Sequence, residues 1–134
     1  MSYLEITPML ATTDLRGTID FYTRVLGFEC EELDEEFGWT SLGRDNVRIM
    51  FTLPPGHLAF DRPVLSGSLY IYTDDIEADW ERLRFKAKVC FPIEDLDYGT
   101  REFAIYDNNG YVLQFGRELD DDEYEGDGDD YDEE

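Results

Sequence analysis

The sequence predicts an α+β fold built from two βαβββ modules. Two segments place apolar residues at helical spacing directly after a strand-like run. Each predicted helix is followed by three short runs that alternate apolar and polar residues, with Gly and Asn turns between them. A shift of 61 residues aligns the two segments and pairs Leu15 with Ile76, Ile19 with Trp80, Tyr22 with Leu83 and Phe28 with Val89.

The first module is expected over residues 4–53. A strand at 4–11 is followed by a helix that carries Ile19, Tyr22 and Leu26 on one face. Gly27 is expected to end this helix, because glycine accepts the left-handed conformation of a C-cap without strain. Strands are then predicted at 28–33, 39–42 and 47–53.

The second module is expected over residues 67–117, after a linker at 54–66 that is rich in Pro and Gly. A strand at 68–73 leads into a helix, with Asp74 as the expected N-cap and Glu77 completing a capping box. Strands follow at 88–93, 101–106 and 111–115. The turn between the last two contains Asn109 and Gly110, a pair that tolerates positive φ and favours a hairpin.

Charge separates the body of the chain from its end. The net charge of the 134 residues is −22, and residues 118–134 contain 12 acidic residues and no basic one. We expect residues 118–134 to form a disordered acidic tail, because they hold too few apolar groups to offset the entropy of ordering. The remaining 1–117 form the folded domain, with 21 acidic and 11 basic residues. This acidity disfavours a nucleic-acid partner.

No 18-residue apolar run is present, so neither a transmembrane helix nor a membrane partner is expected. The first residues lack the basic and apolar regions of a signal peptide, which makes a cytoplasmic location the expectation. Cys30 and Cys90 lack metal-ligand spacing and are interpreted as free thiols. His57, the single histidine, falls in the linker and cannot assemble a histidine-based metal site or catalytic triad alone.

Alternation in the strands predicts two different sheet faces. One face is apolar and is expected to pack under the helices. The opposite face is mixed and suggests that the two modules pair into a curved mixed sheet enclosing a cavity, although a face half-buried against a partner is the alternative. It comprises Thr7, Met9, Arg48, Met50, Ser68, Tyr70, Tyr72, Val112 and Gln114.

The paired modules, the segment 20–28 (DFYTRVLGF) and the turn at 107–111 (DNNGY) together resemble the glyoxalase/bleomycin-resistance/extradiol dioxygenase superfamily, also called vicinal oxygen chelate proteins. The resemblance covers residues 4 to about 117. The stretch 98–103 (YGTREF) resembles the bleomycin-resistance-like branch.

This resemblance implies four inward positions that hold a metal in the enzymes of the superfamily. The matching residues are Thr7, Met50, Ser68 and Gln114. Neutral hydroxyls, a thioether and an amide are poor ligands for zinc, iron or manganese, which prefer imidazole, thiolate or carboxylate. We therefore expect no metal and no cofactor.

The resemblance and the acidic composition together predict a protein that binds a small aromatic or cationic compound, as in resistance to bleomycin-type antibiotics. The expected ligand-binding residues are Trp39, Arg48, Tyr70, Tyr98, Arg101 and Glu102, and no catalytic residue is assigned. The resemblance also implies a homodimer, which would cover the open sheet edge of each module.

Two alternatives stay open. The chain could be a lyase- or isomerase-type enzyme in which Glu5 and Glu102 provide acid–base chemistry, although salt bridges of these carboxylates to Arg48 or Arg101 are the plainer interpretation. It could also be a dimeric domain that uses its acidic tail for interaction. The sequence does not identify the ligand.

Overall fold

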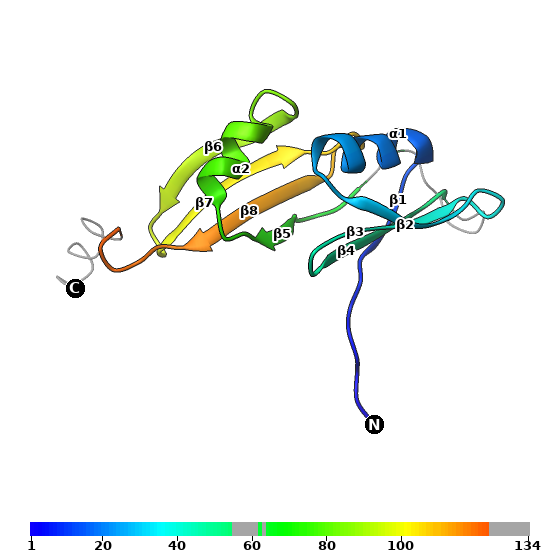
Figure 1. The fold of residues 1–134 in the computed structure, drawn as a ribbon, viewed down its shortest axis with the longest axis horizontal. Helices are drawn as coiled ribbons and strands as arrows, with labels where there is room; N and C mark the ends of the chain where they lie inside the picture. Colours follow the sequence, from blue (N-terminus) through cyan, green and yellow to red (C-terminus); the bar gives the residue numbers. More distant parts are fainter. Residues whose placement is uncertain (55–61, 63, 124–134) are drawn as a thin grey trace. The chain divides into compact units, whose positions relative to one another are not determined.

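The computed structural model describes residues 1–54, 62 and 64–123, which form two compact units (Figure 1). The first unit comprises Met1–Ser66 and Asp107–Tyr111, and the second comprises Gly67–Tyr106 and Val112–Glu134. Each unit contains its own four-stranded sheet, and the expected α+β class is confirmed. The strands form two four-stranded sheets, and neither of them is closed.

The first unit follows the predicted βαβββ order. Its strand order is β1-β4-β3-β2, with β1 parallel to β4 and the other neighbours antiparallel. The first strand is shorter than expected, because ladder pairing begins only at Met9. The elements are β1 (Met9–Ala11), α1 (Leu15–Asp20) with a π-helical continuation (Phe21–Val25), β2 (Glu29–Asp34), β3 (Trp39–Arg44) and β4 (Val47–Thr52).

The second unit repeats this topology with the strand order β5-β8-β7-β6, again with one parallel pair. Helix α2 packs against the strands β7 and β8 (Figure 1). The elements are β5 (Leu69–Tyr72), α2 (Ile76–Leu83), β6 (Lys88–Leu96), β7 (Thr100–Tyr106) and β8 (Val112–Glu118). No helix in the described part of the chain is long and apolar enough to cross a membrane.

The helix ends follow the predicted chemistry, with one displacement. Gly27 has a φ of 78°, as a helix-ending glycine should. The N-cap of α2 is Asp75, whose side chain accepts a hydrogen bond from the Ala78 amide at 3.3 Å. The expected cap, Asp74, is therefore wrong by one residue, because the helix begins at Ile76 and the cap must directly precede it.

Each unit has an aromatic core on the helix-covered face of its sheet. In the first unit the ring of Tyr22 packs edge-on against Phe28, with centroids 5.4 Å apart, and also contacts Phe51 at 5.2 Å. In the second unit Phe103 lies between Trp80 at 5.3 Å and Phe115 at 5.0 Å. The predicted apolar face therefore supplies the core of both units through Ile49, Phe51, Leu113 and Phe115, whereas Leu53 is 40% exposed.

The turn Asp107–Tyr111 joins β7 to β8 along the chain, yet it belongs to the first unit. The buried Asp107 carboxylate accepts hydrogen bonds from the Tyr22 hydroxyl at 2.7 Å and from the Tyr111 amide at 2.9 Å. Asn109 accepts from Thr12 at 2.7 Å through its side-chain oxygen. The turn therefore supplies the polar partners that two buried side chains of the first unit require.

The buried Tyr22 hydroxyl should make stability fall at alkaline pH. Burial and the neighbouring Asp107 carboxylate raise the pKa of Tyr22 well above its usual value of 10.0. Above pH 10 the tyrosine of the unfolded chain loses its proton while the folded chain keeps it, so folding becomes less favourable as pH rises. One such group contributes up to about 1.4 kcal/mol of unfolding free energy per pH unit.

Urea unfolding at pH 8, 10 and 11 measures this effect. We expect the loss between pH 10 and 11 to be smaller by about 1 kcal/mol in Tyr22→Phe than in the unchanged protein, because the variant lacks the titrating group. Parallel pH dependences of the two proteins would contradict the assignment.

Ordered contacts continue past the predicted domain end at residue 117. Strand β8 ends at Glu118, and the Leu119 amide donates to the Gly99 carbonyl at 2.9 Å. Glu123 forms an ion pair with Arg117 at 2.7 Å, and this pairing lowers the pKa of the Glu123 carboxyl to about 2. Residues 124–134 and His57 lie outside the described residues.

Candidate functional site

The face of the second sheet opposite α2 carries a polar cluster drawn from three strands. Strand pairing places Tyr70 of β5 beside Gln114 of β8, and Glu102 of β7 beside Gly116 of β8. Side chains in a strand alternate between faces, so Glu102 points away from Phe103, whose ring lies in the core under α2. The cluster therefore lies on the open face of this sheet.

Glu102 is the centre of the cluster. Its side chain is buried, with 1% of its surface exposed. One carboxylate oxygen, Oε2, accepts from the Tyr70 hydroxyl at 2.5 Å and from the Thr100 hydroxyl at 3.0 Å. The other, Oε1, accepts from the Gln114 amide at 2.7 Å, and the Tyr98 hydroxyl lies 3.3 Å from both oxygens. All of these donors are neutral groups.

Gly116 makes the contact between Tyr70 and Glu102 possible. A Cβ atom at position 116 would stand 2.0 Å from the Tyr70 hydroxyl oxygen and 3.1 Å from Cγ of Glu102. The tyrosine hydroxyl therefore occupies the space that a side chain at this position would fill. The first sheet has a similar feature at Gly43, where a Cβ atom would meet the Glu31 carboxylate at 2.4 Å.

The cluster holds its tyrosines in the protonated form. Burial, followed by the hydrogen bond to Glu102, raises the pKa of Tyr70 far above its usual value. Burial and the nearby Glu102 charge also raise the pKa of Tyr98. Both hydroxyls therefore act as hydrogen-bond donors to the carboxylate, and neither is suited to act as a general base near neutral pH.

Aromatic surface is open to solvent around the buried carboxylate. Tyr70 is 37% exposed, Tyr98 67% and Tyr72 73%. The rings of Tyr70 and Tyr72 lie 4.9 Å apart at an interplanar angle of 55°. An open group of tyrosines on one sheet face is a surface that flat or cationic ligands can contact.

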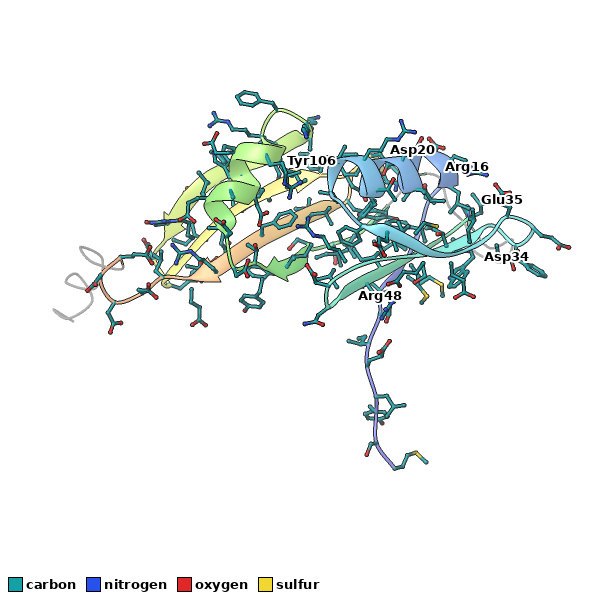
Figure 2. The ribbon with its side chains drawn as sticks, in the orientation of Figure 1. Arg16, Asp20, Asp34, Glu35, Arg48 and Tyr106 are labelled. Carbon is teal, nitrogen blue, oxygen red and sulfur yellow. The ribbon has the colours of Figure 1, made fainter. Side chains whose placement is uncertain are left out.

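The open face of the first sheet carries a smaller set of predicted residues. Thr40 and Leu42 are buried in the core, so the alternate residue Trp39 points to the open face, where Met50 also lies. Arg48 lies on the side of this sheet away from α1 (Figure 2). Its guanidinium pairs with Glu31 at 2.8 Å, which lowers the pKa of that carboxyl. The Arg48 guanidinium is therefore already paired within the chain, and a ligand would share it with Glu31.

The structure therefore divides the predicted ligand-binding residues. Tyr70, Tyr98 and Glu102 meet in one cluster, whereas Trp39 and Arg48 belong to the first unit. Arg101 does not join the cluster. It points to the helix side, where it pairs with Asp95 at 2.6 Å and with Glu77 of α2 at 2.5 Å, and these bonds raise its pKa.

Sequence reasoning missed two members of the cluster. Thr100 donates to Glu102, and its position two residues earlier in the same strand was a usable signal. Gly116 lies in β8 between Phe115 and Arg117, and nothing in the local sequence distinguishes it from a plain strand glycine. Its role, leaving room for the Tyr70 hydroxyl, follows only from the strand register and from the direction of the Tyr70 side chain.

The donor set at the four positions corresponding to metal ligands does not fit a metal ion. The Ser68 hydroxyl donates to the Gln114 carbonyl oxygen at 2.8 Å, and the Gln114 amide donates to Glu102. Thr7 precedes β1 and donates to Glu5 at 3.3 Å, while Met50 offers only a thioether. Neutral hydroxyl, amide and thioether groups are poor ligands for divalent transition metals.

The family model described as "Glyoxalase/Bleomycin resistance protein/Dioxygenase superfamily" matches residues 5–115. This chain therefore belongs to the glyoxalase/bleomycin resistance protein/dioxygenase superfamily, and the resemblance seen in its motifs is confirmed. No curated protein matches the chain in sequence.

Solved structures share the fold at low sequence identity. The crystal structure of TioX from Micromonospora sp. ML1 superposes with a TM-score of 0.71 at 20% identity, covering 87% of this chain and 100% of that one. A superfamily member from Sphaerobacter thermophilus superposes with a TM-score of 0.72 at 20% identity, covering 88% and 98%. The bleomycin-binding protein from bleomycin-producing Streptomyces verticillus, solved with copper(II)-bleomycin, gives 0.66 at 22% identity, covering 86% and 96%.

Proposed function

We propose that this chain is a small-molecule-binding protein that holds an aromatic or cationic compound on the open face of its second sheet, without transforming it. The observation that carries the proposal is the buried Glu102 carboxylate, fixed by four neutral donors beneath exposed tyrosine rings. Such a site offers fixed shape, aromatic contact and negative charge, the properties that bind rather than react. Resistance to a bleomycin-type antibiotic by sequestration is the proposed biological role.

Similarity of fold to the bleomycin-binding protein of Streptomyces verticillus supports the small-molecule-binding function. The residues at the site support it more directly. Tyr70 and Tyr98 keep their protons, and each Glu102 oxygen accepts from hydrogen-bond donors of the chain itself. Acid–base catalysis by this cluster is therefore the less favoured function. Trp39 and Arg48 stay proposed ligand contacts on the first sheet.

A thermal-shift screen of aromatic and cationic compounds tests the function. A ligand at 100 times its Kd adds about 2.7 kcal/mol to the free energy of unfolding. A compound that binds should stabilise both the unchanged protein and the control variant Phe85→Leu. Phe85 is an exposed ring just after α2, on the side of the sheet away from the proposed face. The same compound should stabilise Tyr98→Leu much less. Equal stabilisation of all three proteins would place the site elsewhere, and a screen without hits would count against the function.

We also propose that the chain forms a homodimer through its N-terminal arm, residues 1–8. The apolar side chains Tyr3, Leu4 and Ile6 of the arm are fully exposed, and the ladder to β4 begins only at Met9. Exposed apolar side chains on an extended segment favour association with another chain. Light scattering at micromolar concentration should report a dimer for the full chain and a shift towards monomer for the double variant Leu4→Asp, Ile6→Asp. A full chain that is monomeric at this concentration would refute the proposal.

A further inference from the structure

We propose that the open face of the second sheet binds an organic cation of the ammonium type, whose charge rests on the rings of Tyr70, Tyr72 and Tyr98 and not on a carboxylate oxygen. This inference rests on the proposed function, because it names the ligand class for the same face. Three features carry it: negative charge that lacks an internal counter-ion, carboxylate oxygens that are already occupied, and tyrosine rings open to solvent.

The Glu102 charge on this face is not balanced by an ion pair within the described residues, because Lys88, which shares the face as the strand partner of Tyr106, places its ammonium over the Tyr106 ring at 5.4 Å. None of the ion pairs found there includes Glu102. Glu94 of β6 is the direct strand partner of Glu102, so a second carboxylate shares this face of the sheet. Like charges directly opposite each other across two strands are destabilising. A bound cation would relieve this repulsion, which the sheet does not do for itself.

Arginine does not provide that relief, although one adjoins Glu102 in sequence. Arg101 points to the opposite side of β7, where Asp95 and Glu77 hold its guanidinium. Arg117, its strand partner, is likewise paired with Glu77 and Glu123. The basic groups of this unit nearest to the cluster along the strands are therefore committed to the helix-covered side. Around Glu102 the open face is left with carboxylate, neutral polar and aromatic groups.

The Glu102 oxygens offer little room for a direct salt bridge. Oε2 accepts from Tyr70 and Thr100, Oε1 accepts from Gln114, and the Tyr98 hydroxyl lies 3.3 Å from both. The carboxylate is also almost completely buried, so a ligand N–H could reach it only by displacing one of these donors. The negative charge of Glu102 therefore acts on a ligand through Tyr70 and Tyr98, whose hydroxyls donate to the carboxylate. A hydroxyl that donates to an anion leaves its ring more electron-rich and improves the ring face as a partner for a cation.

The rings provide the contact surface. Tyr70 and Tyr72 alternate with the half-buried Leu69 and Ile71 on β5, so both point to the open face, and their planes are inclined by 55°. Tyr98, from the turn between β6 and β7, directs its hydroxyl to the same carboxylate as Tyr70. A positive charge placed against such rings needs no hydrogen-bond donor of its own. A methylated ammonium group, which has no N–H, should therefore bind as well as a primary amine.

Choline and its uncharged isostere 3,3-dimethylbutan-1-ol test the inference on the full chain. Dissociation constants are measured by NMR titration at low salt, with ethanolamine as the primary amine. We expect choline to bind about tenfold or more tightly than the isostere, and at least as tightly as ethanolamine. Tyr72→Leu and Glu102→Gln should each reduce the preference for choline to within about threefold. Phe85→Leu should retain it.

Specific outcomes would overturn the inference. Equal affinity for choline and the isostere would show that charge does not matter, and ethanolamine binding tenfold more tightly than choline would show a direct salt bridge. Binding of neutral aromatic compounds without choline would reject the cation while leaving the proposed function intact, whereas binding of no compound class would reject both. Tyr72→Leu, an exposed substitution, decides the matter even where Glu102→Gln fails to fold.

Discussion

Replacing Asp107 by alanine is expected to lower the free energy of unfolding by about 3 kcal/mol or more. The Asp107 carboxylate accepts from the Tyr22 hydroxyl at 2.7 Å, the Asn109 amide at 2.8 Å and the Tyr111 amide at 2.9 Å. Alanine removes all three bonds and leaves the hydroxyl of a fully buried tyrosine without its partner. Burial raises the pKa of Asp107, which shows that ionising this group already costs free energy.

The conservative variant Asp107→Asn separates hydrogen bonding from charge. Its side-chain oxygen can still accept from the two turn amides, so we expect a loss of only about 1 kcal/mol. Equilibrium urea unfolding of the three proteins at pH 7 provides the comparison. An alanine variant within 1 kcal/mol of the unchanged protein would mean that the turn is held mainly by the contacts of Asn109 and Tyr111.

Replacing Gly116 by alanine should disconnect Tyr70 from Glu102. The new methyl group would lie 2.0 Å from the Tyr70 hydroxyl oxygen and 2.7 Å from Cζ, so the ring must move. Overpacking of this kind typically costs about 1–3 kcal/mol. The raised pKa of Tyr70 depends on its burial and on the Glu102 bond, so it should fall back towards 10.0. Affinity for a ligand held on the Tyr70 ring should drop about tenfold or more.

NMR titration with the tyrosine ring carbons labelled reads this pKa without any ligand, and Tyr70→Phe identifies the resonance. Gly67→Ala is the matched control, because a Cβ atom at position 67 would meet nothing within 4 Å. It should leave the pKa of Tyr70 unchanged and should not destabilise the protein. A Tyr70 resonance that titrates in Gly116→Ala as it does in the unchanged protein would show that the ring adapts without leaving Glu102.

Local patterns in the sequence were sufficient to predict the elements. The spacing of Ile76, Trp80 and Leu83 gave the buried face of α2, and all three residues are buried. The alternation in residues 47–53 gave the core face of β4, with Ile49 and Phe51 buried. Patterns of this kind are readable because a helix or strand with one buried face must repeat apolar residues at its own period. The 61-residue shift between the two segments then predicted the repeated topology, which the strand orders confirm.

Element ends were less predictable, because they depend on partners outside the element. Strand β1 was expected to begin near Leu4, where the residues alternate suitably, but it begins at Met9, where pairing with β4 begins. The N-cap fell on Asp75 and not on Asp74, since both aspartates satisfy the sequence preference and only the backbone path selects one.

The candidate site shows most clearly which features local sequence patterns predict and which depend on tertiary contacts. The sequence by itself determined the superfamily, the two-module fold and the shared face of Tyr70 and Gln114, because alternation assigns faces and the motifs identify the family. Only the tertiary structure decided that Arg101 pairs across the other side of β7, that Thr100 joins the cluster and that Gly116 leaves room for the Tyr70 hydroxyl. These facts depend on strand register and on contacts between residues far apart in the chain, and local periodicity does not contain that information.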